Sequence, residues 1–297
     1  MRAPEIDVRP MTADVTCAKK KAAALAHRDS TVTLKVEIVR LEHGGRRSDW
    51  GVSPFGDSRI DASMPYGGLQ LGHWHEIGGD GMEREMPAAA TGFAAALAHH
   101  TQRGGAIVWA LQRDDLHAPG LRRFGIDLDR LILVRVGRDD DVLSVQEDAL
   151  RTRGVTVAIG EVDKIDLTAG RRLQIACEKS GATGFVLRRK LYGAPLQQAR
   201  AQATAAATRW RIAAAPSETR TPGLGSPRLA ARLDRCRGGR TGAWIVEMQD
   251  AASTQTGPIR VVAKLADHTL ETDHENALPR RPRHHDTGGR RAALGCG

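Results

Sequence analysis

The most constraining feature of this 297-residue chain is residues 67–97, which read as a short apolar strand, a glycine-rich turn and an alanine-rich helix. The strand is expected from His73 to Ile77 and the helix from about Ala88. The turn between them carries three glycines, Gly78, Gly79 and Gly81. Backbone N–H groups and the positive end of the helix dipole converge at such a turn, and together they can hold a phosphate.

The turn lacks the side chains that a working phosphate-binding loop needs. The P-loop motif GxxxxGK[ST] supplies a lysine to the β- and γ-phosphates and a hydroxyl to Mg²⁺. No glycine in this chain is followed by lysine. Arg84 is the basic residue of the turn, and it lies among the carboxylates Asp80, Glu83 and Glu85, which repel a triphosphate. We therefore predict a degenerate P-loop with no catalytic residue and no cofactor.

Apolar strands alternating with helices follow this stretch. Strands are expected at Ala106–Leu111, Arg130–Val136, Val155–Val162 and Thr183–Arg189. Helices are expected near Leu121, from about Asp141 to Arg153 and from Thr168 to Lys179. This alternation predicts an α/β fold with a mainly parallel sheet that helices flank on both faces.

The chain divides into five predicted parts. These are a disordered N-terminus (1–16), an N-terminal helix (17–45), the α/β core (50–190), a basic strand and hairpin extension of the core (191–251) and a disordered basic tail (252–297). The hairpin is centred on Gly238-Gly239, and the tail loses hydrophobic periodicity before it ends in PRRPRHHDTGGRR. In the N-terminal helix, Leu34, Ile38 and Leu41 form an apolar stripe. The stripe fits either a partner or the protein's own core.

Positive charge is concentrated in the second half. The whole chain has a net charge of +9, whereas Val186 to Gly242 contains twelve Arg or Lys residues against two acids, Glu218 and Asp234, a local net charge of +10. Arginine binds phosphate or carboxylate bidentately. The segment therefore predicts contact with nucleic acid or with acidic patches on partner proteins. The candidate residues are Arg188, Arg189, Lys190, Arg209, Arg211, Arg235, Arg237 and Arg240.

Several classes of site and location are disfavoured by the sequence. The four cysteines lie far apart, so neither a zinc site nor a disulfide framework is predicted, and no metal is expected. No apolar run approaches the length of a membrane span, which predicts a cytoplasmic protein with no membrane contact. Glu161 ends a strand where an ATPase would place its Mg²⁺-binding acid. Asp114 and Asp115 follow another strand, either as a helix cap or at a ligand edge.

Several segments together resemble known proteins. GGLQLGHWHEIGG before the alanine-rich helix is similar to the approach to the ATP loop of RecA-type recombinases. From about Arg40 to Ala251 the chain resembles the ImuA family, the bacterial RecA-related proteins of inducible mutagenesis. The resembling segments include FGDSRIDASMPYGGLQLGHWHEIGG, LQRDDLHAPGLRRFGIDLDRLILVRVGRDDDVL, VAIGEVDKIDLTAGRRLQIACEKSGATGFVLR and RLDRCRGGRTGAWIVE.

The resemblance implies a RecA-like core and an accessory role in SOS-induced, error-prone translesion DNA synthesis near the nucleoid. The partners it implies are an ImuB-type polymerase-like protein and an error-prone DnaE2-type polymerase, with RecA and single-stranded DNA as further candidates. Two alternatives stay open: a divergent RecA-like ATPase that binds single-stranded DNA, and a cell-division inhibitor similar to SulA. The missing lysine favours a non-catalytic adaptor, because that lysine stabilises the charge of the transferring phosphoryl group.

Overall fold

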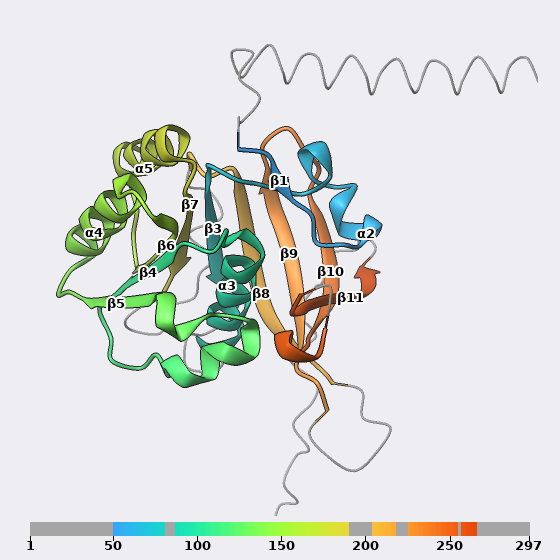
Figure 1. The fold of residues 1–297 in the computed structure, drawn as a ribbon. Coiled ribbons are helices and arrows are strands. Elements are labelled where there is room, and N and C mark those ends of the chain that lie inside the picture. The colour runs from blue at the N-terminus through green and yellow to red at the C-terminus, as the bar shows by residue number, and fades with distance from the viewer. Residues whose placement is uncertain (1–49, 81–86, 190–203, 218–224, 255–256, 266–297) are drawn as a thin grey trace, which may run out of the picture. The chain divides into compact units, whose positions relative to one another are not determined.

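The computed structural model describes residues 50–80, 87–189, 204–217, 225–254 and 257–265 (Figure 1). In this part of the chain nine strands form one sheet. The parallel strands are β3 (Trp74–Gly79), β4 (Ala106–Leu111), β5 (Leu131–Arg135), β6 (Val155–Val162), β7 (Thr183–Arg188) and β8 (Thr208–Ala215). The antiparallel ones that continue from β8 are β9 (Arg228–Cys236), β10 (Gly242–Met248) and β11 (Ile259–Leu265).

The strand order across the sheet is β11-β10-β9-β8-β3-β7-β6-β4-β5. The three main described helices are α3 (Pro87–Thr101), α4 (Asp139–Arg151) and α5 (Leu167–Ser180). Shorter elements are β1 (Val52–Ser53), α2 (Ser58–Asp61), β2 (Leu69–Gln70) and 3₁₀ turns at Pro65–Gly67, Ala118–Phe124, Leu128–Arg130 and Ala251–Ser253. This confirms the predicted α/β class with a mostly parallel sheet. None of the described helices is long and apolar enough to cross a membrane.

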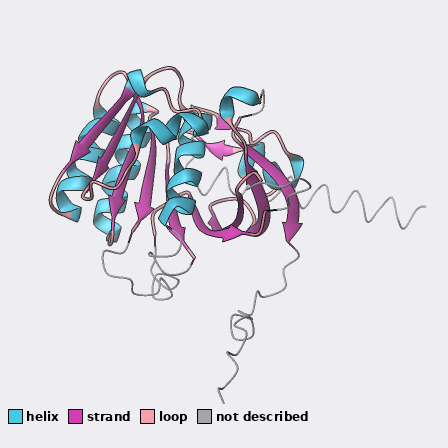
Figure 2. Ribbon diagram, turned by 90° about the horizontal axis from the view of Figure 1, so that it is seen from below, coloured by secondary structure: helices cyan, strands magenta, loops and turns pink. Residues whose placement is uncertain are grey.

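Helices cover both faces of the parallel strands (Figure 2). On one face α3 packs on β3 and β8, and its alanines, from Ala94 to Ala98, are fully buried because small side chains let the helix approach the sheet closely. On the other face α4 and α5 cover β4, β6 and β7. The two faces therefore enclose separate apolar clusters, which we call the α3 core and the α4/α5 core.

The helix boundaries follow local capping chemistry. α5 begins after Asp166, whose carboxylate accepts the N–H of Ala169 at 2.7 Å, and it ends at Gly181, which adopts a left-handed φ of 78°. α4 begins at Asp139, two residues before the predicted start. The acidic side chains of its first turn stabilise the helix because they lie at the positive end of its dipole. These caps account for the small shifts from the predicted ranges.

Two predictions about strand ends are wrong. Gly78 and Gly79 were expected in a turn, but they complete β3, and neither adopts a positive φ. The disordered tail was predicted from residue 252, but β11 occupies 259–265 and pairs with β10. The segment IRVVAKL carries Arg260 and Lys264 on an edge strand, so its hydrophobic signal is weak. The predicted N-terminal parts, 1–16 and 17–45, lie outside the described residues.

A buried hydrogen-bonded chain joins β2, β3 and β8. The Trp210 indole N–H donates to Thr208 Oγ1 at 3.0 Å, and Thr208 Oγ1 lies 2.8 Å from His75 Nδ1. His75 Nε2 lies 2.9 Å from the carbonyl of Gln70. Because a carbonyl can only accept, Nε2 carries a proton, and in the neutral ring Nδ1 accepts from the Thr208 hydroxyl. Burial lowers the pKa of His75 to about 3, and burial likewise lowers the pKa of His100 to about 4.

We predict that the protein loses stability in mild acid. In the unfolded chain both histidines take up a proton below about pH 6.5, whereas the folded protein keeps them neutral, so the free energy of unfolding falls as the pH drops from there toward the folded pKa values. In His75→Gln this dependence should weaken by about 1.4 kcal/mol per pH unit. Urea unfolding measured across this pH range tests it. The control is Leu167→Gln, at an exposed side chain that does not titrate, and it should keep the wild-type slope.

Candidate functional site

The carboxyl ends of the parallel strands bring several charged residues together. β3 contributes Glu76, β6 contributes Glu161, and β7 ends at Arg188 and leads directly into Arg189. Ligands of open α/β sheets bind at this edge. Asp115 reaches it from the segment after β4. This edge of the sheet is therefore the candidate functional site within the described part of the chain.

The Arg189 guanidinium forms ion pairs with two carboxylates at this edge. Its guanidinium donates to Glu161 Oε2 at 2.8 Å and to both oxygens of Asp115, at 2.9 and 2.8 Å. The other oxygen of Glu161 accepts the indole N–H of Trp109 at 2.8 Å. Burial raises the pKa of Glu161, against the opposing effect of Arg189, while the hydrogen bonds from Arg189 lower the pKa of Asp115. The acid in the Mg²⁺-binding position thus has an internal cation.

A second buried cluster is built on Glu76. One oxygen pairs with Arg188 of β7 and the other with Arg209 of β8, both at 3.0 Å. The Arg188 Nε also donates to the carbonyl of Asp163 at 2.9 Å. The Glu76 and Arg188 side chains are only 3% and 7% exposed. Glu76 therefore joins three neighbouring strands, β7, β3 and β8.

The remaining predicted arginines are engaged within the protein. Arg211 forms a bidentate pair with Asp234 and a longer contact, 3.5 Å, with Asp80. Burial opposes the charge of Arg211, but these carboxylates raise its pKa. Three others donate to backbone carbonyls: Arg235 to Thr204, Arg237 to Ala205 and Arg240 to Ala62. Their contact with nucleic acid or a partner stays a prediction.

Other predicted site residues fall outside the described residues. These are Gly81 of the turn, Lys190 of the basic set and the helical stripe Leu34, Ile38 and Leu41. Of the two acids after β4, Asp114 pairs with Arg135 at 2.9 Å and is largely exposed, so neither it nor Asp115 caps a helix. Within the described residues, no group of three or more His, Cys, Asp or Glu side chains could hold a metal ion.

Little space is left beside Glu161. The cavity there has a volume of about 10 Å³, room for about one water molecule. Its lining is Gln112, Arg113, Glu161, Val162 and Arg189. Nearby, the Asp139 carboxylate accepts the backbone N–H groups of Asp163 and Lys164, at 3.2 and 2.9 Å, and so fixes the loop after β6. The strand ends are tied to one another instead of framing an open ligand site.

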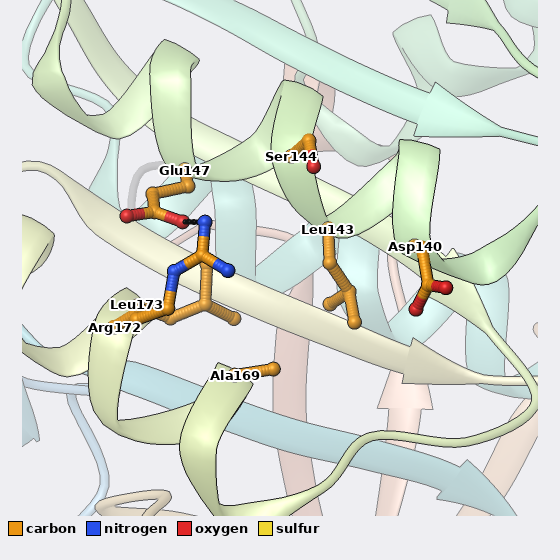
Figure 3. A pocket seen from close by; sticks show the side chains of 7 residues that line it. All are labelled: Asp140, Leu143, Ser144, Glu147, Ala169, Arg172 and Leu173. Carbon is orange, nitrogen blue, oxygen red and sulfur yellow. Dashed lines mark ion pairs between the residues drawn. The ribbon is translucent and has the colours of Figure 1, made fainter.

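A larger cleft, about 130 Å³, lies between α4 and α5 (Figure 3). It is lined by Asp140, Leu143, Ser144, Glu147, Ala169, Arg172 and Leu173. Glu147, whose side chain is 5% exposed, pairs with Arg172 across the cleft and with Arg151 on its own helix. The sequence reading missed this cluster, although Glu147 and Arg151 have the i, i+4 spacing of a helical ion pair. The ion pair between Glu147 and Arg172 holds the two helices together.

Comparison with known proteins gives one consistent relationship. No family model matches the chain. The chain is 46% identical over 232 residues to Protein ImuA of Caulobacter vibrioides, both in strain NA1000 / CB15N and in strain ATCC 19089 / CIP 103742 / CB 15. The aligned region covers 76% of this chain and 95% of the relative.

We predict that Glu76→Gln strongly destabilises the fold. The change removes the buried carboxylate to which Arg188 and Arg209 both donate, and it is the only carboxylate that pairs with Arg188 among the described residues, so the cost is roughly 3–5 kcal/mol. The matched control is Asp114→Asn, which breaks an exposed pair worth roughly 0–1 kcal/mol. Chemical denaturation of both variants gives the two free energies of unfolding. Equal losses in the two would contradict the central role of Glu76.

Proposed function

The chain belongs to the ImuA family, and on that premise we propose that it is a non-catalytic accessory protein of inducible, error-prone DNA synthesis after DNA damage. In this proposal it acts as an adaptor. It joins an ImuB-type polymerase-like protein to an error-prone polymerase and performs no chemistry on nucleotides. The alignment with the ImuA relative spans 76% of this chain. The proposal therefore concerns the core and its extension together.

The arrangement of the core supports a RecA-like interpretation. In Figure 1, β3 lies in the middle of the sheet, and α3 is the next described element along the chain. A strand followed by a helix is the order of the two elements that flank a phosphate-binding loop. We interpret this segment as a P-loop that has lost its function. No lysine occurs between Ile77 and Leu97, so nothing there supplies the charge that a phosphoryl group needs.

The observation that carries the non-catalytic proposal is the pairing of Glu161 with Arg189. In an ATPase of this arrangement the acid at the end of this strand helps to hold Mg²⁺. Here that carboxylate is 4% exposed, and both of its oxygens accept hydrogen bonds from protein groups, Trp109 and Arg189. A metal ion would have to displace Arg189, which Asp115 also holds. The buried ion pairs thus support a structural role for this edge.

We predict no ATP hydrolysis above background. The purified full chain, incubated with Mg²⁺-ATP with and without single-stranded DNA, should release phosphate no faster than Glu161→Gln, since no working site is altered. Glu161→Gln is chosen because an amide can still accept the Trp109 hydrogen bond, while Asp115 keeps Arg189 paired. Turnover in the wild type that is lost in this variant would contradict the proposal.

We also predict the effect in cells. Deleting the gene should lower the frequency of mutations induced by DNA damage, and the Glu161→Gln allele should restore it fully, because the acid is not catalytic. Mutation frequency after ultraviolet irradiation, with protein levels checked by immunoblot, measures both effects. An unchanged frequency in the deletion strain would refute the proposed role. A Glu161→Gln allele that is present at normal level yet inactive would refute only the non-catalytic part.

A further inference from the structure

The extension of the sheet is covered by apolar packing on one face only. Trp210 of β8, Leu233 of β9 and Trp244 of β10 point into the α3 core. The α4/α5 core, on the opposite face, contains no described residue of β8, β9, β10 or β11. The sheets of α/β proteins are normally covered on both faces. Here, by contrast, no described helix covers the opposite face of the extension.

The strand register arranges that opposite face in three rows. The middle row is small and apolar: Ala213, Ala230, Ile245 and Ala263. The row on one side is Arg211, Arg232, Ala243 and Leu265, and the row on the other is Ala215, Arg228, Glu247 and Arg260. We call these twelve positions the arginine face. All except Glu247 are half-buried or exposed.

The charges of this face are not balanced. Arg211 and Arg232 stand directly opposite each other on β8 and β9, and like charges in that position destabilise a sheet. Arg211 is compensated by Asp234, whereas Arg232 has no hydrogen-bond or ion-pair partner among the described residues. On the other side one carboxylate, Glu247, is shared between Arg228 at 3.3 Å and Arg260 at 2.8 Å. The side that carries Arg232 therefore has an excess positive charge.

The dimensions of the face suit a short protein segment. Four strands at a spacing of about 4.8 Å make the apolar row roughly 14 Å long, which equals between two and three turns of an α-helix. Aliphatic side chains of the bound segment would cover the alanines and Ile245 of that row. Acidic side chains of the same segment would reach the arginines in the two rows beside it. Such a mixture of apolar contact and arginine is typical of protein interfaces.

We propose that the arginine face docks an acidic segment of a partner protein, with aliphatic side chains on the apolar row and carboxylates on Arg232 and on the exposed Arg260. This rests on the proposed adaptor function and names the surface that performs it. Nucleic acid fits the face less well. Phosphates gain nothing from the apolar row, and no described aromatic side chain stands on this face to stack on a base.

The test measures two probes on the purified full chain by fluorescence anisotropy. One is a fluorescein-labelled helical peptide with a leucine stripe between two rows of glutamate, and the other is a labelled oligothymidylate. Arg232→Glu should weaken peptide binding about tenfold or more, because it places a like charge opposite the carboxylates. Arg260→Glu, at a side chain 55% exposed, should do the same. The control is Lys264→Glu, an equal change of charge at an exposed residue on the other face of β11, and it should bind as the wild type does.

Folding is checked by thermal unfolding, whose midpoint Arg232→Glu should not lower, because this side chain has no described partner to lose and the change removes a like charge opposite Arg211. The proposal is overturned if the peptide fails to bind, if both face variants bind it like the wild type, or if Lys264→Glu weakens it equally. Oligothymidylate binding that depends on Arg232, without peptide binding, would assign the face to nucleic acid instead. These outcomes concern purified protein and are independent of the mutation frequency of the deletion strain, which tests the proposed function.

Discussion

Glu76 is the residue on which the two halves of the sheet depend. Its carboxylate accepts from Arg188 on one neighbouring strand and from Arg209 on the other, so one buried anion joins β7, β3 and β8. β8 is also where the sheet changes from parallel to antiparallel pairing. Two arginines and one carboxylate in a poorly solvated place are costly to separate, because each would leave a buried charge unpaired. The pairing thus fixes how the extension continues from the core.

The opposite side of the same strands is held by different means. There His75 links Gln70 to Thr208, and Trp210 packs against Phe93 with ring centroids 5.3 Å apart. One face of the β3–β8 junction is therefore ionic and the other is apolar with a neutral hydrogen-bonded chain. Both keep β8 in register with β3. The parallel core and its extension share one continuous apolar cluster on the α3 side.

Arginine serves two purposes in this molecule. At the carboxyl edge of the parallel strands, Arg188 and Arg189 are counter-ions for Glu76 and Glu161. On the arginine face, the Arg232 side chain has no carboxylate partner among the described residues. A local excess of positive charge in the sequence therefore contains both internal ion pairs and a candidate docking surface.

The sequence by itself determined the order of the core elements and two of their ranges, because the buried strands Ala106–Leu111 and Val155–Val162 are continuous apolar runs between clear turn signals. It also showed that no glycine is followed by lysine, and it carried the family resemblance. It did not determine β11, since a short edge strand with alternating charged residues carries little hydrophobic signal.

Only the tertiary structure decided which charges meet. Glu76 and Arg188 are 112 residues apart in the sequence, and Asp115 and Arg189 are 74 apart. No local pattern marks such pairs, because parallel strand order brings them together across long crossovers. The same applies to Arg232: its sequence neighbours resemble those of other arginines, and only the register between β8 and β9 places it opposite Arg211 without a carboxylate of its own. The sequence shows which residues are charged, but only the folded sheet determines which of them form ion pairs.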